Sequence, residues 1–160
     1  MKKEEKVLEL FFNEPTKHWH FEEILKKAKI SRPQACLWLN KLKKEEIIQR
    51  IKKKRRFPYY QGNYRDVRYR NKKRIFTLGL LHNSGFLNHL CSLKEAKTVI
   101  LFGSIVRSDW HNKSDIDIFI YGEDDGFEKG MYERILGREI QLFVAKNKKD
   151  LERMGVLLLE

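Results

Sequence analysis

The sequence has 160 residues, with 34 Lys and Arg against 22 Asp and Glu for a formal net charge of +12, and 41% of its residues are hydrophobic. That hydrophobic content excludes a wholly disordered chain, and its three prolines and nine glycines exclude collagen-like or low-complexity sequence. The longest apolar runs, residues 99–102 and 156–159, fall far short of the roughly 20 residues that span a bilayer. We therefore expect a folded chain without a membrane segment, either one ordinary domain or two small ones.

The two cysteines favour a reducing compartment. Cys36 and Cys91 lie in apolar stretches and show no spacing typical of a metal site or a disulfide. We expect both thiols to be buried and the protein to be cytoplasmic.

The positive charge is concentrated in the middle of the chain. Residues 41–74 hold fifteen basic and three acidic side chains, so this segment carries a surplus equal to the whole net charge. A local field of this sign attracts polyanions, which makes nucleic acid the first partner to consider and an anionic membrane surface the second. A solvated basic face without a partner is the third interpretation. Interleaved aromatic residues disfavour it: Phe57, Tyr59, Tyr60, Tyr64 and Tyr69.

Three helices and a hairpin are predicted in the N-terminal third. Apolar residues recur at helical spacing over residues 4–12 and 20–29. Ser31 is suited to cap a third helix that runs to about residue 45, because Pro33 then lies in its first turn. Residues 47–52 and 56–60 follow as two strands around a basic turn.

This order resembles the winged helix-turn-helix regulators of archaea and bacteria over about residues 4–61. In that family the third helix enters the major groove of double-stranded DNA, and the hairpin wing contacts the backbone or the minor groove. The resemblance implies base contacts from Arg32 and Gln34. It also implies phosphate contacts from Lys41, Lys52, Lys53, Lys54, Arg55 and Arg56.

Two residues depart from the winged-helix pattern. Glu46 stands where the family usually has a glycine between helix and wing, and Leu37 stands where a polar groove contact is usual. Leu37 is therefore a candidate to pack against another domain or subunit. Because winged helices also serve as protein-binding modules, a protein partner is the alternative to DNA.

Residues 63–90 keep a helical pattern that begins strongly basic and becomes apolar. Gly79, Asn83, Ser84 and Gly85 indicate a break, so we predict one or two connecting helices. The expected fold is α+β: a winged helix domain over 1–62, a helical connector over 63–91 and a small mixed-sheet α/β domain over 92–160.

The most informative segment is 98–121. Residues 99–102 are predicted to form a buried strand that ends in a tight turn at Gly103-Ser104, and residues 114–120 form a second strand. Because strand side chains alternate, Ile116, Ile118 and Ile120 point into a core while Asp115 and Asp117 share the other face. Two adjacent carboxylates repel each other and are stable beside a divalent cation, and their hard oxygen atoms suit magnesium shared with substrate phosphates.

Gly103-Ser104, Arg107 and Ser114-Asp115-x-Asp117 together resemble the motif of the nucleotidyltransferase superfamily with a polymerase beta-like palm. The similarity covers about residues 92–153 and is greatest to the minimal nucleotidyltransferases (MNT). It implies transfer of a nucleotidyl group from a nucleoside triphosphate such as ATP, with Mg²⁺. In that setting Gly103 and Ser104 bind the triphosphate, and Asp115 and Asp117 hold the metal ions. The resemblance also implies that Arg107 braces the loop or neutralises charge and that Ser114 orients the motif.

The third carboxylate of that family falls on Gln141, in a predicted strand over 138–144 that follows a helix over 127–136. An amide cannot deprotonate an attacking hydroxyl, so Glu139, two residues earlier on the same face, is the alternative catalytic acid. Two hypotheses follow. The chain is an active nucleotidyltransferase, or it is a DNA-binding regulator whose degenerate domain binds a nucleotide or a protein.

Some proteins similar to the second domain act as antitoxins that modify a HEPN toxin. A HEPN-type toxin is therefore a candidate partner beside double-stranded DNA and the nucleotide, and a homodimer is a further expectation. The apolar ending over 156–159 needs to be covered by the domain itself, by a second subunit or by residues beyond the end of this sequence.

Overall fold

The computed structural model describes residues 3–155, which fall into two units. The N-terminal unit contains residues 3–76 and 110–112, and the C-terminal unit contains residues 77–109 and 113–155. The predicted connector over 63–91 is thus divided between the units at residues 76 and 77. Helices and strands are mixed, as the α+β prediction requires. The apolar ending over 156–159 lies outside the described residues.

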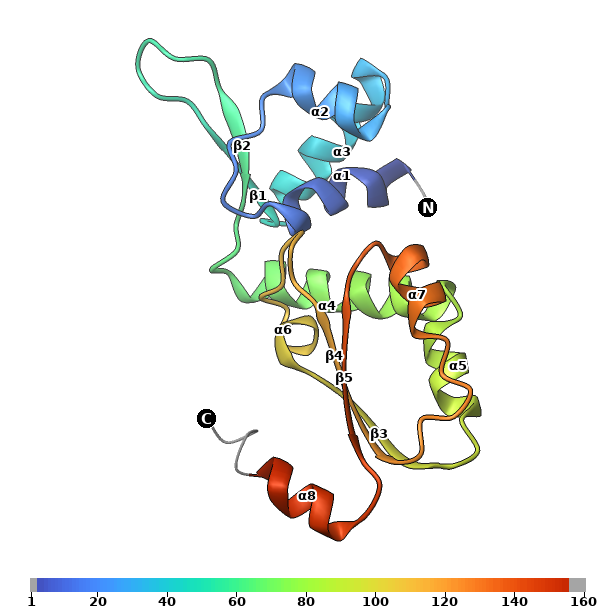
Figure 1. Cartoon of the computed structure of the whole chain (residues 1–160). Helices are drawn as coiled ribbons and strands as arrows, with labels where there is room; N and C mark the ends of the chain where they lie inside the picture. The colour runs from blue at the N-terminus through green and yellow to red at the C-terminus, as the bar shows by residue number, and fades with distance from the viewer. Residues whose placement is uncertain (1–2, 156–160) are drawn as a thin grey trace. The chain divides into compact units, whose positions relative to one another are not determined.

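Three helices and a two-stranded hairpin open the N-terminal unit (Figure 1). At the start of α3 the backbone N–H of Ser31 donates a hydrogen bond to the side-chain Oε1 of Gln34 at 3.3 Å. This contact fixes the start of α3 where the sequence predicts it. The bounds are α1 (Lys3–Asn13), α2 (Phe21–Ala28), α3 (Arg32–Lys44), β1 (Ile48–Ile51) and β2 (Tyr59–Gly62).

The hairpin differs from the predicted one in its second strand. Strand β2 begins at Tyr59, which pairs with Ile51, so residues 52–58 form a loop instead of continuing the ladder. Pro58 has no N–H to donate to a neighbouring strand, which explains the later start. The loop extends away from the three helices (Figure 1), and the Phe57 side chain within it is 84% exposed.

Helix α4 (Val67–Asn83) supplies two side chains that cap the end of α1. The last carbonyls of a helix have no partner within the helix. Tyr69 Oη donates to the carbonyl of Phe11 at 2.7 Å, and Lys73 Nζ donates to the carbonyl of Phe12 at 3.0 Å. The Lys73 ammonium also donates to the carbonyl of Trp110 and lies over the Trp110 ring, 4.1 Å from the ring centroid. Lys73 is only 1% exposed.

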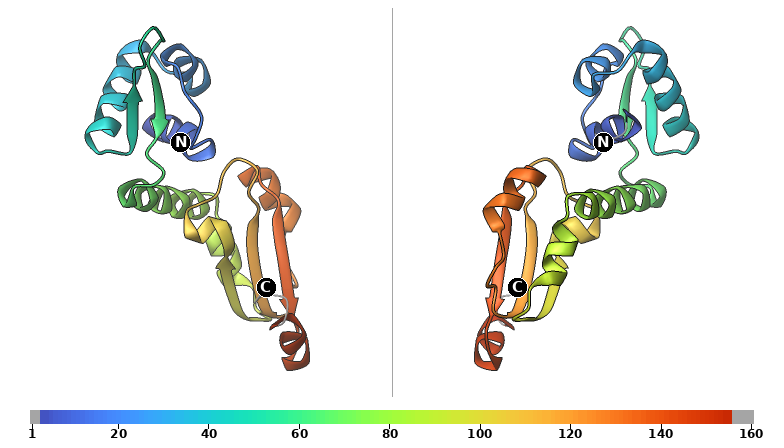
Figure 2. Two further views of the ribbon diagram at one scale, coloured as in Figure 1. Left: turned by 90° about the vertical axis from the view of Figure 1, so that its left-hand side faces the viewer. Right: turned by 90° about the vertical axis from the view of Figure 1, so that its right-hand side faces the viewer.

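The C-terminal unit is built on a three-stranded sheet in the order β3-β4-β5. Strand β3 is antiparallel to β4, and β4 is parallel to β5. Figure 2 shows the three strands side by side, with α8 beyond the end of β5. Its elements after α4 are α5 (Phe86–Ser92), β3 (Ala96–Phe102), α6 (Gly103–Arg107), β4 (Ile116–Gly122), α7 (Lys129–Leu136), β5 (Ile140–Ala145) and α8 (Lys148–Gly155).

Several local predictions are wrong. The strand at 99–102 is not buried: β3 is an edge strand with one partner, and Ile100 is 47% exposed. Both Cys36 and Cys91 are exposed, because each follows a buried helical residue and so lies about 100° further around its helix, away from the buried face. The predicted break between two connecting helices is confirmed at Ser84 and Gly85, but Gly79 lies within α4 and takes no part in it. None of the described helices is long and apolar enough to cross a membrane.

Candidate functional site

The central strand β4 positions the two aspartates. Ile116, Ile118 and Ile120 are 0% exposed, which confirms that this face of the strand is the core face. Asp115 directly precedes the strand and Asp117 is its second residue, and both are only partly exposed. In the sheet, Asp117 pairs with Phe102 at the end of β3 and with Gln141 on β5.

Gly103 makes room for the Asp117 carboxylate. A Cβ atom at position 103 would lie 1.9 Å from Asp117 Oδ2 and 2.8 Å from its Cγ, far inside van der Waals contact. The backbone of Gly103 also has a φ of +70°, which favours glycine. The Gly-Ser motif and the Asp-x-Asp motif are therefore in direct contact. The Asp117 carboxylate can occupy its position only because residue 103 has no side chain.

The Gln141 side chain completes this group. Its Nε2 donates a hydrogen bond to Asp115 Oδ2 at 2.7 Å. Glu139 precedes β5; its backbone carbonyl accepts from the Ile116 N–H at 2.9 Å, and its side chain is exposed. Within residues 3–155, no hydrogen bond or ion pair joins the Glu139 carboxylate to either aspartate. The structure thus brings Gln141, and not Glu139, to the aspartate pair.

The negative charge at this site is only partly balanced. Burial raises the pKa of Asp117, the neighbouring Asp115 carboxylate raises it further, and the Arg107 guanidinium lowers it. Arg107 itself pairs with Asp109, its Nε lying 3.1 Å from Oδ2, so it contributes to the field without contacting the aspartate pair. Metal binding would replace a repulsion between the two carboxylates with an attraction.

The remaining predicted residues lie beside the pair. Ser104 is the second residue of α6 and is partly exposed. The backbone carbonyl of Ser114 accepts a hydrogen bond from Arg138 Nη1 at 2.9 Å, which ties the chain before Asp115 to the start of β5. In the described part of the chain, no group of three or more His, Cys, Asp or Glu side chains is arranged to hold a metal ion. Two carboxylates are therefore the charged ligands that this site offers.

Residues 84–157 match the model of the family described as nucleotidyltransferase domain. This part of the chain is therefore similar to nucleotidyltransferase domains. The match contains Gly103, Asp115, Asp117 and Gln141, and domains of this kind typically use a nucleoside triphosphate and a divalent metal ion. No curated protein and no solved structure gives a significant match to the chain.

In the N-terminal unit, the predicted DNA contacts on α3 already have partners. Arg32 Nη2 lies 2.7 Å from a Glu22 carboxylate oxygen, and Lys41 Nζ lies 2.9 Å from Glu4 Oε1. The Gln34 amide is used by the cap of α3. A sequence pattern does not reveal these contacts, because Lys41 and Glu4 are 37 residues apart.

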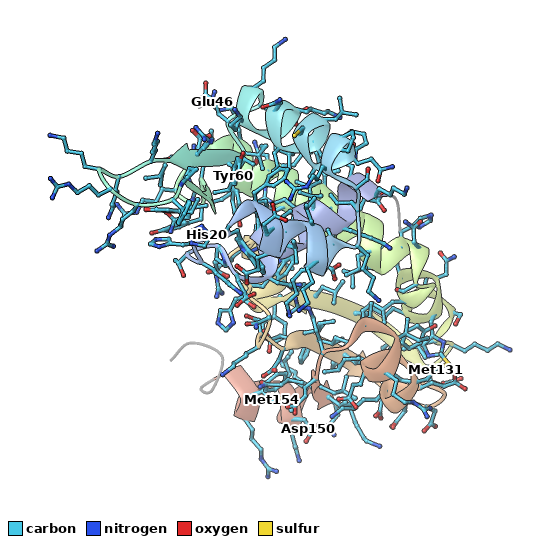
Figure 3. All side chains as sticks on the ribbon, turned by 90° about the horizontal axis from the view of Figure 1, so that it is seen from above. His20, Glu46, Tyr60, Met131, Asp150 and Met154 are labelled. Atoms are coloured by element: carbon cyan, nitrogen blue, oxygen red, sulfur yellow. The ribbon has the colours of Figure 1, made fainter. Side chains whose placement is uncertain are left out.

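The cations of the loop between β1 and β2, which we call the wing loop, have no such partners. All five of its predicted phosphate contacts are exposed, and none forms an ion pair within residues 3–155. Figure 3 shows nitrogen-ended side chains spreading outward from this loop. The five residues are Lys52, Lys53, Lys54, Arg55 and Arg56.

An open hollow of about 570 Å³ at the base of the hairpin was not predicted from the sequence. A chain of hydrogen bonds forms one side of it: Gln49 Nε2 donates to Asn63 Oδ1 at 2.7 Å, and Asn63 Nδ2 donates to the carbonyl of Glu46 at 3.1 Å. Glu46, labelled in Figure 3, has a φ of +57°, and the family resemblance places a glycine at this position. The hollow is lined by Lys43, Glu46, Ile48, Gln49, Arg50 and Asn63.

Proposed function

We propose that the chain transfers a nucleoside monophosphate from a triphosphate, with ATP as the first candidate, and that its N-terminal unit is a winged helix that binds double-stranded DNA. The observation that supports the transferase is the contact of the Asp117 carboxylate with Gly103, beside Asp115. It brings together a loop without side-chain bulk, suited to phosphates, and two carboxylates, suited to a cation.

The side chains fit a magnesium ion. Asp115 and Asp117 offer hard oxygen ligands from adjacent strand positions, and a bound triphosphate would supply further oxygens. When bound, the ion would neutralise the phosphates and stabilise charge at the α-phosphorus. Gly103 lets the phosphates approach the backbone, Ser104 offers a hydroxyl to them, and Arg107 adds a positive field.

The reaction joins an acceptor oxygen to the α-phosphorus and breaks the bond to the β-phosphate, which leaves as pyrophosphate. We assign removal of the acceptor proton to Glu139. Its exposed carboxylate would need a rotamer that reaches toward the aspartate pair, since no contact with the pair is present. The proposal does not specify the acceptor of the nucleotidyl group, and a HEPN-type toxin is one protein candidate.

A labelling experiment tests the transferase. The full chain is incubated with Mg²⁺ and α-labelled ATP, GTP, CTP or UTP, and with RNA or protein from a cell extract as acceptor. The Asp115→Asn/Asp117→Asn variant should lose about a hundredfold of the label transferred, because charge stabilisation of this kind accounts for several kcal/mol. Asp125→Asn, an exposed acid outside the site, is the control. Equal labelling by the double variant and the unchanged chain contradicts the proposal.

The wing loop supports DNA binding. Its five cations are exposed and have no acidic partners in the described chain, so a phosphate backbone would displace only water and counterions from them. The salt dependence of duplex binding is measured as the slope of log affinity against log salt concentration. Replacing all five cations by Gln should reduce the magnitude of this slope by about four to five.

The matched control for the wing variant is Arg32→Gln/Lys41→Gln. Both of these cations are already paired with carboxylates, so the slope should change by much less than the roughly 0.9 that each full phosphate contact contributes. An unchanged slope in the wing variant, or a larger loss in the control, contradicts the wing assignment.

The hydrogen bond from Gln141 to Asp115 favours a second candidate function. A chain without a third carboxylate can bind a nucleotide and act as a DNA-binding regulator without turnover. Saturable binding of ATP with Mg²⁺, together with no label on any acceptor, would support this regulator over the transferase.

A further inference from the structure

Position 141 decides how much charge the carboxylate site carries. Strand β5 runs parallel to β4 with Asp117 opposite Gln141, so a side chain at 141 reaches the aspartates without any change in the backbone. The residue there is an amide, and the described chain has no third acid in the cluster. The protein ligands therefore supply two negative charges, both from β4 and the residue before it.

The orientation of the Gln141 amide closes one side of Asp115. Its Nε2 donates to Asp115 Oδ2 at 2.7 Å, so one carboxylate oxygen is occupied by an N–H. An amide nitrogen has no lone pair to offer a cation, and its hydrogens are positively polarised. In this orientation the amide presents its N–H, and not its oxygen, to Asp115, so it supplies no ligand to a cation between Asp115 and residue 141.

The other side of Asp115 remains available. Asp117 lies two residues further along on the same face of the chain, so the two carboxylates are neighbours of like charge. The Asp117 carboxylate is in turn held against Gly103, which restricts where its oxygens lie. This leaves one place where both aspartates can act as ligands.

We infer that Gln141 limits this site to one divalent cation and positions Asp115 to bind it. The inference rests on the proposed function, because it assumes that the aspartates hold a cation beside a nucleotide. A bound nucleotide would then share this single cation, and these side chains would hold no second cation for the acceptor oxygen. Restoring an acid at position 141 should open a second cation site.

Counting bound Mn²⁺ tests the inference. The full chain is titrated with Mn²⁺ in the presence of a saturating ATP analogue with a methylene bridge between the α- and β-phosphates, and bound ion is measured by electron paramagnetic resonance. After Mn²⁺ bound to free analogue is subtracted, we expect one Mn²⁺ bound per unchanged chain. The Gln141→Glu chain should bind two. Asn40→Asp, which adds the same charge at an exposed position of α3, should keep one.

A second variant tests the positioning role. Gln141→Ala removes the hydrogen bond to Asp115 without adding an acid, so it should still bind one Mn²⁺ but with several-fold lower affinity. Two Mn²⁺ in the unchanged chain, or one in a folded Gln141→Glu chain, would overturn the inference and leave the proposed nucleotide site intact. No Mn²⁺ and no analogue bound to the unchanged chain would instead overturn the proposed function.

Discussion

The wing loop and the aspartate pair are both clusters of like charge, but they differ in how the charge is held. The wing cations lie at the ends of long exposed side chains, where water and salt screen them. Asp115 and Asp117 are short side chains fixed by β4, and Asp117 is partly buried against Gly103. A raised pKa is found at Asp117, and its leading cause is burial.

This difference predicts two kinds of binding. Ligand binding at the wing loop should be driven by counterion release and should weaken steeply with salt. Cation binding at the aspartates should instead relieve a repulsion that the fold imposes, so it should respond less to salt and more to small changes in geometry. Three substitutions can break or sharpen this contrast.

The largest effect is expected from Gly103→Ala. The new Cβ would overlap Asp117 Oδ2 and force the carboxylate away, and the positive φ would add roughly 1 kcal/mol of strain. We expect the affinity for Mn²⁺ with an ATP analogue to fall about tenfold or more, as measured by calorimetry.

Gly137→Ala is the matched control for Gly103→Ala. Gly137 has a similar φ of +63°, but no atom lies within 4 Å of its added Cβ. This variant should show the backbone strain alone and keep its cation and nucleotide affinity. If both variants bind equally well, the contact between Gly103 and Asp117 does not determine the site.

A smaller effect, on stability alone, is expected from Lys73→Met. Lys73 belongs to the same unit as the wing loop but is buried, and its ammonium satisfies the carbonyls of Phe12 and Trp110. Removing it should cost roughly 1–3 kcal/mol in the free energy of unfolding, measured by urea titration. Lys53→Met, at an exposed wing position, should change that energy by less than about 0.5 kcal/mol. Similar losses in both variants would contradict the contrast between fixed and screened charges.

The smallest effect is expected from Asp117→Asn. A carboxyl whose pKa is raised by folding stabilises the folded state in its protonated form, and this contribution is lost as the pH rises through the raised pKa. At neutral pH the asparagine should therefore raise the melting temperature by roughly 1–3 °C. The gain should disappear below the ordinary pKa of 3.8, where the aspartate is protonated in both states. Destabilisation at neutral pH would count against like-charge strain at this site.

The parts of the site that follow from local rules could be predicted from the sequence. Alternation along one strand was enough to place Ile116, Ile118 and Ile120 in the core and the two aspartates on the other face. The start of α3 was predictable for the same reason, because Ser31 and Gln34 act within one helical turn.

The parts that depend on pairing between distant segments could not be predicted. The clash that any side chain at 103 would make with Asp117 depends on the register of β3 against β4. The exposure of Ile100 depends on β3 lying at the edge of the sheet. The ion pair that occupies Lys41 depends on Glu4, which lies on another helix.

The N-terminal unit includes Trp110–Asn112, a segment that the chain reaches only after α6 and leaves before β4. Its bonds are to residues from much earlier in the chain: the carbonyl of Trp110 accepts from Lys73, and the Asn112 N–H donates to the carbonyl of Asn13 at 2.9 Å. A genetic exchange that replaced residues 1–76 with another domain would remove both Lys73 and Asn13. Residues 110–112 would then lose these hydrogen-bond partners. The two halves are therefore not interchangeable modules, and recombination at their boundary would have to transplant a tryptophan from the middle of the other half.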